Sequence, residues 1–311
     1  MNHSVIEDDF ATNLHADSDA NRPLAPSWEN YSIDVMDEWK VLLESNPEED
    51  EVHSFLALHP ALIPGGSGDI GPGGHHGSDL GIVFTEPELR GTGESFLPDF
   101  MWVTRSSGVI TPILIEIEKP SKRWFRKDGR PTADFTCAKD QLNEWRAWFE
   151  DPINVESFKK RFLLVDDRFP GRPLEPQFLL IYGRAKEFTP GGGHSKPEKL
   201  IKKRDSQKAS AETLRTFDSL YPNYNHRHSI TAKMTPGGIL PFAFSPVYGT
   251  GPTLIEHILE IGDPSSALHR SVMMTSERKE YLSTRWKFWA DVALDRDENP
   301  QRRYVMGTTR E

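Results

Sequence analysis

The chain has a single cysteine, Cys137, among its 311 residues, and it has no run of about eighteen apolar residues. One cysteine excludes an internal disulfide and fits a reducing compartment, so we expect a cytoplasmic protein. Without a long apolar run, no transmembrane helix and no membrane partner are expected. The acidic start of the chain also lacks the regions of a secretory signal. Cys137 lies on a stretch with helical periodicity, and we predict a buried, unreactive thiol there.

Three common catalytic or cofactor-binding patterns are also missing. The glycine-rich segment 64–78 lacks the Gly-Lys-Ser/Thr ending of a P-loop, which disfavours nucleotide binding there. No Gly-x-Ser-x-Gly motif supports a serine hydrolase. His75-His76 have no Cys/His pair at zinc-site spacing, so a zinc enzyme is disfavoured.

Positive charge is scarce at the N-terminal end of the chain. The formal net charge is −10, but residues 1–51 hold 14 acidic and two basic side chains, a charge of −12. The remaining 260 residues hold 33 acidic and 35 basic side chains, a charge of +2. The body of the protein is therefore compatible with an acidic partner such as DNA.

Two clusters of basic residues stand out in that body. The first basic segment consists of Lys119, Lys122, Arg123, Arg126, Lys127 and Arg130. It directly follows a strand that ends in carboxylates, and we expect it to contact the phosphate backbone of a nucleic acid. The second basic segment consists of Lys196, Lys199, Lys202, Lys203, Arg204 and Lys208. Taken alone, it is slightly more typical of a solvated loop than of a phosphate contact.

The order of elements favours a mixed α/β sheet with helices on its faces. Helices are predicted at 32–44, 47–58, 133–149, 197–218, 252–260 and 276–294, and strands at 79–84, 96–104, 110–118, 161–165, 177–182 and 228–233. We divide the chain into a disordered acidic tail, a central domain and a mainly helical C-terminal extension, with the boundaries 1–28, 29–235 and 236–311.

The most informative pattern is a set of acids at the ends of two strands. Asp99 lies in the apolar run 96–103, and Glu116 and Glu118 end the apolar run 110–118. Successive side chains of a strand alternate between its faces, so Glu116 and Glu118 point the same way. Crowded carboxylates are costly unless a cation lies among them, and oxygen ligands suit Mg²⁺ or Mn²⁺. The alternative is an ordinary edge strand, on which Glu116 and Glu118 are exposed to solvent and bind no metal.

The array Pro98-Asp99 … Glu116-x-Glu118 resembles the PD-(D/E)xK nuclease superfamily. Segments 51–62, 137–145 and 180–184 are similar to the Shedu anti-phage defence nucleases within it, and the resemblance spans about residues 48 to 235. It implies a restriction-endonuclease-like mixed β-sheet flanked by helices. It also implies a metal-dependent DNA endonuclease of a bacterial defence system, which forms homo-oligomers, dimers or tetramers.

The resemblance also assigns roles to individual residues. Asp99, Glu116 and Glu118 would be the ligands of Mg²⁺, or of Mn²⁺, with Glu118 as a third ligand or as the group that orients water. Gln141 would bind the catalytic strand or a phosphate. Glu51, on the preceding helix, would complete the metal's shell through water.

One position departs from the family pattern. The family usually has lysine two residues after the strand glutamate, where this chain has Glu118, and Lys119 follows. On a regular strand Lys119 faces away from Glu116, and only a bulge would re-aim it. An alternative function is therefore a catalytically inactive DNA-binding or sensing module, and a second is a scaffold that binds no DNA.

Overall fold

The structure is a computed structural model that describes residues 22–71, 78–106, 108–164, 171–251 and 257–298. Its helices are α2 (Trp28–Glu44), α3 (Glu49–Leu58), α4 (Ala133–Phe149), α5 (Pro152–Arg161), α6 (Pro197–Asp205), α7 (Ser265–Arg270) and α8 (Ser276–Glu298). Its strands are β1 (Ser78–Thr85), β2 (Phe100–Arg105), β3 (Ile110–Ile117), β4 (Gln177–Ile181), β5 (Glu212–Arg215), β6 (Ile230–Thr235) and β7 (Gly238–Phe244). Short 3-10 helices include η2 (Ala185–Phe188) and η6 (Ile258–Glu260).

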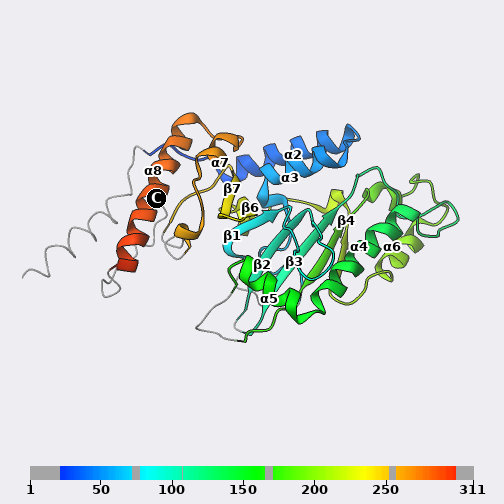
Figure 1. Cartoon of the computed structure of the whole chain (residues 1–311). Helices are drawn as coiled ribbons and strands as arrows, with labels where there is room; N and C mark the ends of the chain where they lie inside the picture. Colours follow the sequence, from blue (N-terminus) through cyan, green and yellow to red (C-terminus); the bar gives the residue numbers. More distant parts are fainter. Residues whose placement is uncertain (1–21, 72–77, 107, 165–170, 252–256, 299–311) are drawn as a thin grey trace, which may run out of the picture.

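The seven strands of the described residues form one mixed sheet in the order β5-β4-β3-β2-β1-β6-β7 (Figure 1). β1, β2 and β3 form an antiparallel meander at its centre. β4 and β5 continue it in parallel on one side, and β6 pairs in parallel with β1 on the other. The mixed α/β architecture with flanking helices, predicted from the order of elements, is confirmed.

Alternate residues of β3 pack into two separate cores. Ile113, Ile115 and Ile117 contribute to the core shared with α2 and α3, whereas Leu114 contributes to the core shared with α4 and α5. β3 is buried along its whole length. Figure 1 accordingly shows α2 and α3 on one face of the sheet and α4 and α5 on the other. Glu116, two residues after Leu114, therefore belongs to the α4 face.

Capping residues set where the helices around β3 begin. α4 starts after Thr132, whose hydroxyl accepts a hydrogen bond from Phe135 N–H, and its bounds match the predicted helix 133–149. α3 starts with a capping box, in which the N–H of Glu48 donates to Glu51 Oε2 at 2.8 Å. This contact fixes the first turn of α3 next to the end of β3.

Two element predictions are wrong. The strand expected at 161–165 overlaps α5, which Asp151 caps and Pro152 begins, so the apolar residues before Leu164 end a helix. The helix expected at 197–218 ends at Asp205, and the chain then forms β5.

The prediction of a buried thiol at Cys137 is also wrong. Cys137 is exposed, because the buried stripe of α4 runs through Phe135, Ala138 and Leu142.

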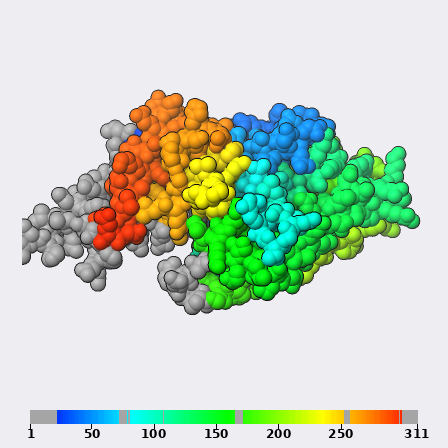
Figure 2. Space-filling view, in the orientation of Figure 1, coloured from blue at the N-terminus to red at the C-terminus, as the bar shows by residue number. Residues whose placement is uncertain are grey.

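The sheet continues beyond residue 235, since β7 pairs with β6 in an antiparallel hairpin. α7 packs on β7, and α8 lies at the end of the molecule opposite the segment that follows β3 (Figure 2). No helix within the described part of the chain combines the length and apolar character needed to cross a membrane. Residues 1–21 of the predicted tail, His75-His76 and residues 252–256 lie outside the described residues.

Candidate active site

Two strand ends bring Asp99 and Glu116 together. β2 and β3 are antiparallel, with Phe100 opposite Ile115, so the register places Asp99 opposite Glu116. Directly opposed residues of such a pair have Cβ atoms roughly 5 Å apart. The two carboxyl groups lie close enough for each to shift the pKa of the other. The structure thus brings together two of the three carboxylates that the sequence predicts as metal ligands.

Asp99 is held at this position by the backbone of β3. Its Oδ2 accepts a hydrogen bond from the N–H of Ile117 at 2.8 Å. Burial raises the pKa of Asp99 to about 7, the Ile117 N–H opposes that rise, and the nearby Glu49 and Glu118 add to it. A carboxyl that is surrounded by other acids in this way gains most from a cation.

Glu116 is more strongly perturbed than Asp99. It is 8 % exposed, and burial, followed by the charges of Asp99, Glu118 and Glu49, raises its pKa well above the usual range. Gln141 on α4 lies next to the carboxylate of Glu116 and opposes this rise. The Oε2 of Glu116 is buried and has no hydrogen-bond partner among the described residues. Such an orphaned oxygen is the kind of atom that a metal ligand presents.

Glu118 follows the last residue of β3 and is paired with a lysine. A turn closed by the N–H of Lys122 and the carbonyl of Lys119, at 3.0 Å, folds Lys122 back along the chain. The ammonium of Lys122 forms an ion pair with Glu118 Oε2. Burial lowers the pKa of Lys122, but the hydrogen bond and charge of Glu118 outweigh this and raise it overall. A lysine therefore reaches the cluster from position 122.

Lys119 itself points elsewhere, as the strand geometry suggests. Its ammonium forms an ion pair with Glu48, just before α3. Its backbone also lies near the carboxylate of Glu49 and partly offsets the rise that burial causes in the pKa of that group. Lys119 thus ties α3 to the end of β3, and its side chain does not join the carboxylates of Asp99 and Glu116.

On α3, the acid that lies beside the carboxylates is Glu49 and not the predicted Glu51. Glu51 is exposed, and its carboxylate caps α3. Glu49 is also exposed, but it lies beside Glu118, and partial burial followed by the charge of Glu118 raises its pKa. The spacing of Glu49 to the buried Val52 and Leu56, three and seven residues on, could have identified it as the acid on the sheet-facing side of α3.

The carboxylates form a pair rather than a closed cage. Among the described residues, no three aspartate, glutamate, histidine or cysteine side chains converge closely enough to hold a metal ion by themselves. Mg²⁺ commonly binds through one or two carboxylates, with waters and substrate phosphates completing its shell. The Asp99–Glu116 pair, with its unpartnered Glu116 oxygen, fits an open site of that kind.

The two basic segments, about 70 residues apart in sequence, lie side by side in space. The ammonium of Lys203 donates to the carbonyl of Gly129 at 2.6 Å, and Arg204 lies over the ring of Trp124 at 5.8 Å. Near Asp128, the guanidinium groups of Arg126 and Arg130 lie 3.8 and 4.0 Å from its carboxylate. Lys127 is exposed in the same loop. α6 and the loop after β3 therefore form one basic region.

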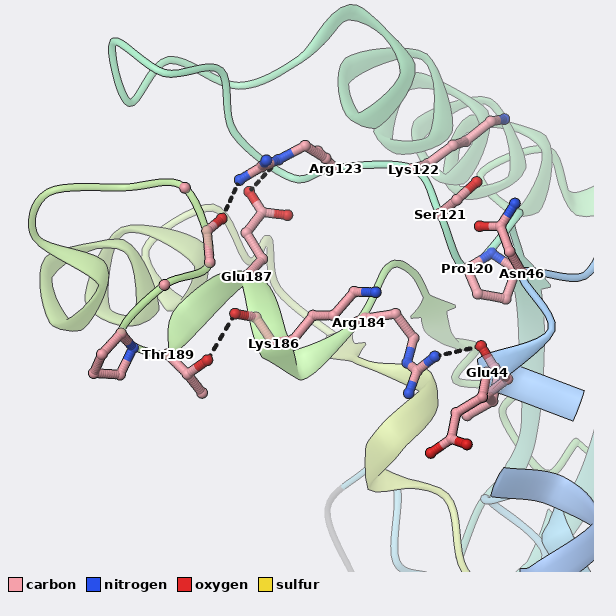
Figure 3. A pocket seen from close by; sticks show the side chains of 15 residues that line it. Glu44, Asn46, Pro120, Ser121, Lys122, Arg123, Arg184, Lys186, Glu187 and Thr189 are labelled. Atoms are coloured by element: carbon pink, nitrogen blue, oxygen red, sulfur yellow. Dashed lines mark hydrogen bonds and ion pairs between the residues drawn. The ribbon is translucent and has the colours of Figure 1, made fainter. Parts of the chain in front are cut away.

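A groove opens beside Lys122 and is hereafter called the basic groove (Figure 3). Its volume is about 790 Å³, and it is lined by residues 43, 44, 46, 120–123, 184, 186, 187 and 189–193. Of the predicted phosphate-contacting residues, Lys122 and Arg123 line it. Arg184 and Lys186 also line it, and the sequence analysis gave them no role because they follow a different strand, β4.

Fold and site together define a mixed α/β protein with a buried carboxylate pair at the ends of two central strands, next to a basic region. Residues 46–221 match the family model SduA_C, described as the C-terminal part of the Shedu protein SduA. The match covers more than half of the chain, and the chain belongs to the Shedu family. Membership implies a role in anti-phage defence. Searches of curated proteins and of solved structures return no match.

Proposed function

We propose that the chain is a metal-dependent DNA endonuclease with a restriction-endonuclease-like PD-(D/E)xK core, acting in anti-phage defence. The observation that carries the proposal is the Asp99–Glu116 pair, buried among other acids, with the Oε2 of Glu116 unpartnered. Such a pair is unfavourable by itself and becomes favourable when a divalent cation neutralises it. Mg²⁺ is the proposed ion, with Mn²⁺ as a substitute.

The chain's own residues then have distinct tasks. Bound Mg²⁺ would supply charge neutralisation at the phosphate and a more acidic water. Asp99 and Glu116 would hold the ion, with Ile117 N–H and Gln141 fixing their orientation. Glu118 would accept a proton from the attacking water. Lys122 would move from Glu118 to the phosphate as negative charge develops there.

The cytoplasmic location and the dimer or tetramer implied by the family resemblance stay predictions. The inactive DNA-binding or sensing module also remains an alternative, because Glu118 occupies the usual lysine position and is already paired with Lys122. In that case the protein would bind DNA without cutting it. The recruitment of Lys122 supports the active enzyme.

The test is cleavage of linear and supercoiled DNA with Mg²⁺, Mn²⁺ or EDTA, comparing the wild type with Asp99→Ala and Glu116→Ala. We expect metal-dependent cutting that each variant lowers by about 10³-fold or more, since lost metal binding costs several kcal/mol in the transition state. Glu51→Ala is the matched control, because Glu51 lies outside the pair, and it should cut like the wild type. DNA binding without cutting under any condition would establish the inactive module instead.

A further inference from the structure

We propose that the basic groove binds the sugar-phosphate backbone of a nucleic-acid strand that leads to the carboxylate pair, and that Lys186 is one of its phosphate contacts. The inference rests on the proposed function and extends it from the cutting site to the path of the substrate. It is carried by the charge, construction and position of the groove.

The groove presents cations from two separate parts of the chain. Lys122 and Arg123 follow β3, and Arg184 and Lys186 follow β4, so the pairs come from neighbouring parallel strands. Figure 3 shows Lys122 and Arg123 on one side and Lys186 and Arg184 on the other. Because Lys122 lines the groove and also forms an ion pair with Glu118, the groove adjoins the carboxylate cluster.

The buried acid of the groove, Glu187, does not cancel this charge. Glu187 at its base is 5 % exposed and accepts hydrogen bonds from the backbone N–H groups of Trp124 and Phe125 at 2.9 and 3.0 Å. It also contacts His194 at 3.1 Å and lies 3.8 Å from Arg123, so its charge is compensated from within the protein. Glu44, the last residue of α2, is the exposed acid on the rim.

One wall of the groove is built to a fixed shape. Arg123 donates to the carbonyl of Gly192 at 2.5 Å and contacts His194 at 3.0 Å, which attaches the glycine-rich loop 190–193 to the first basic segment. A Cβ on Gly192 would lie 2.3 Å from the carbonyl oxygen of Lys186, so only glycine allows this approach. The cations are therefore held around a preformed space.

The four cations do not contribute equally. Arg184 is bound to Asp218 at 2.8 Å and to the carbonyl of Leu43 at 2.6 Å, so it holds α2 against the groove. Arg123 supports the loop. Lys186 is exposed, and no ion pair holds it within the described part of the chain. Its ammonium is thus the one most open to an incoming phosphate.

The lining favours a polymer backbone over a free nucleotide. None of the 15 lining residues is aromatic, and Asn46 is the single side-chain amide among them. A nucleotide pocket needs groups that stack on the base or read its edge, whereas backbone recognition needs cations alone. We therefore expect binding that is independent of sequence and strongly dependent on salt.

The test measures the affinity for a fluorescent DNA duplex as a function of KCl concentration, in EDTA. The parent protein carries Asp99→Asn and Glu116→Gln, which removes cleavage and the negative charge of the pair that repels phosphate. Lys186→Ala should flatten the slope of log K against log salt by about 0.9, the loss of one phosphate contact. The matched control is Lys287→Ala on α8, at the far end of the molecule, which should leave the slope unchanged (Figure 1).

A gain-of-binding variant keeps the test independent of folding defects. Glu44→Gln removes the acid on the rim and should tighten binding. Equal slopes for the parent, Lys186→Ala and Lys287→Ala would overturn the groove but leave the nuclease proposal to its own cleavage assay. Absence of DNA binding by the parent would overturn both. Displacement of the DNA by a mononucleotide at comparable concentration would show that the groove reads a base, and would also overturn the proposal.

Discussion

Two kinds of buried carboxylate occur on this sheet, and they differ in what surrounds them. Glu212 has a fully buried side chain that forms an ion pair with Lys139 and lies 3.5 Å from Arg146. Glu116 is buried to the same extent and Asp99 is half-buried, but their neighbours are mainly other acids and an amide. A buried charge whose partners are built into the protein serves the fold. A buried carboxylate without a protein cation beside it indicates a site that binds a cation from solution.

The largest expected difference between the two kinds of carboxylate is in how their replacement changes the free energy of unfolding. In EDTA above pH 7, Asp99→Asn should raise the free energy of unfolding by roughly 2–4 kcal/mol, because it removes the burial of a charge and the repulsion that together raise the pKa of Asp99. Glu212→Gln should lower it by roughly 1–3 kcal/mol, because it leaves two cations without their carboxylate. Urea unfolding of both variants measures the difference. Destabilisation by both to the same extent would remove the distinction.

The pH dependence of stability should separate the carboxylate pair from the buried histidines. The folded protein binds a proton at Asp99 up to about pH 7, so the free energy of unfolding falls as pH rises from about 4 to 7. Burial lowers the pKa of His59 and His226 to about 4, so their neutral forms are favoured and stability is lost as pH falls from about 6.5 to 4.

The two effects oppose each other, and the double variant Asp99→Asn/Glu116→Gln should leave the histidine effect dominant, because both acids with a strongly raised pKa are removed. We expect its unfolding free energy, measured in EDTA, to rise with pH from 4 to 6.5 by up to about 3 kcal/mol for each histidine and then to level off. The wild type should show a flatter profile that declines towards pH 7. Identical profiles would show that the two carboxyl groups titrate normally.

A smaller effect should distinguish the two lysines that follow β3. Lys122→Ala should reduce metal-dependent cleavage by about 10- to 100-fold, because it removes a cation from the reacting phosphate. Lys119→Ala is the matched control, since its ammonium pairs with the exposed Glu48, and its effect should stay under about threefold. Initial cleavage rates at saturating Mg²⁺ compare them. A larger loss for Lys119 would restore the lysine adjacent to position 118 as the reactive one.

The smallest effect concerns Cys137. Its side chain is exposed on the solvent face of α4, so Cys137→Ser should change the free energy of unfolding by less than about 0.5 kcal/mol. The wild-type thiol should also react with a maleimide in the folded protein. A thiol that stays unreactive until unfolding would support the buried position predicted from the sequence.

The sequence was most informative where local pattern and tertiary role coincide. α4 has a capping threonine and a continuous apolar stripe, and its bounds were predicted at both ends. Asp99 and Glu116 were identified because they lie beside or within strongly apolar strands, and Gln141 was identified through the family resemblance. The strand expected at 161–165 failed because a short apolar run does not distinguish a strand from a helix end, and the Asp151-Pro152 start signal carried the information.

The remaining parts of the site depend on contacts between distant segments. Which of Glu49 and Glu51 lies beside the carboxylates depends on the orientation of α3 about its axis. The buried Val52 and Leu56 set that orientation. The return of Lys122 to Glu118 depends on the turn after β3. Arg184 and Lys186 join Lys122 and Arg123 only because β3 and β4 pair in parallel. The spacing of residues along the chain does not predict any of these contacts between distant segments.

Binding of Mn²⁺ to the folded protein in the absence of DNA is the most direct test of the account. Titration calorimetry should compare the wild type with Asp99→Asn, Glu116→Gln and the control Glu51→Gln. The account predicts one site per chain that is lost in the first two variants and retained in the control, together with proton release at pH 7. Equal binding in all four proteins, or none in the wild type, would contradict the claim that the Asp99–Glu116 pair holds a divalent cation.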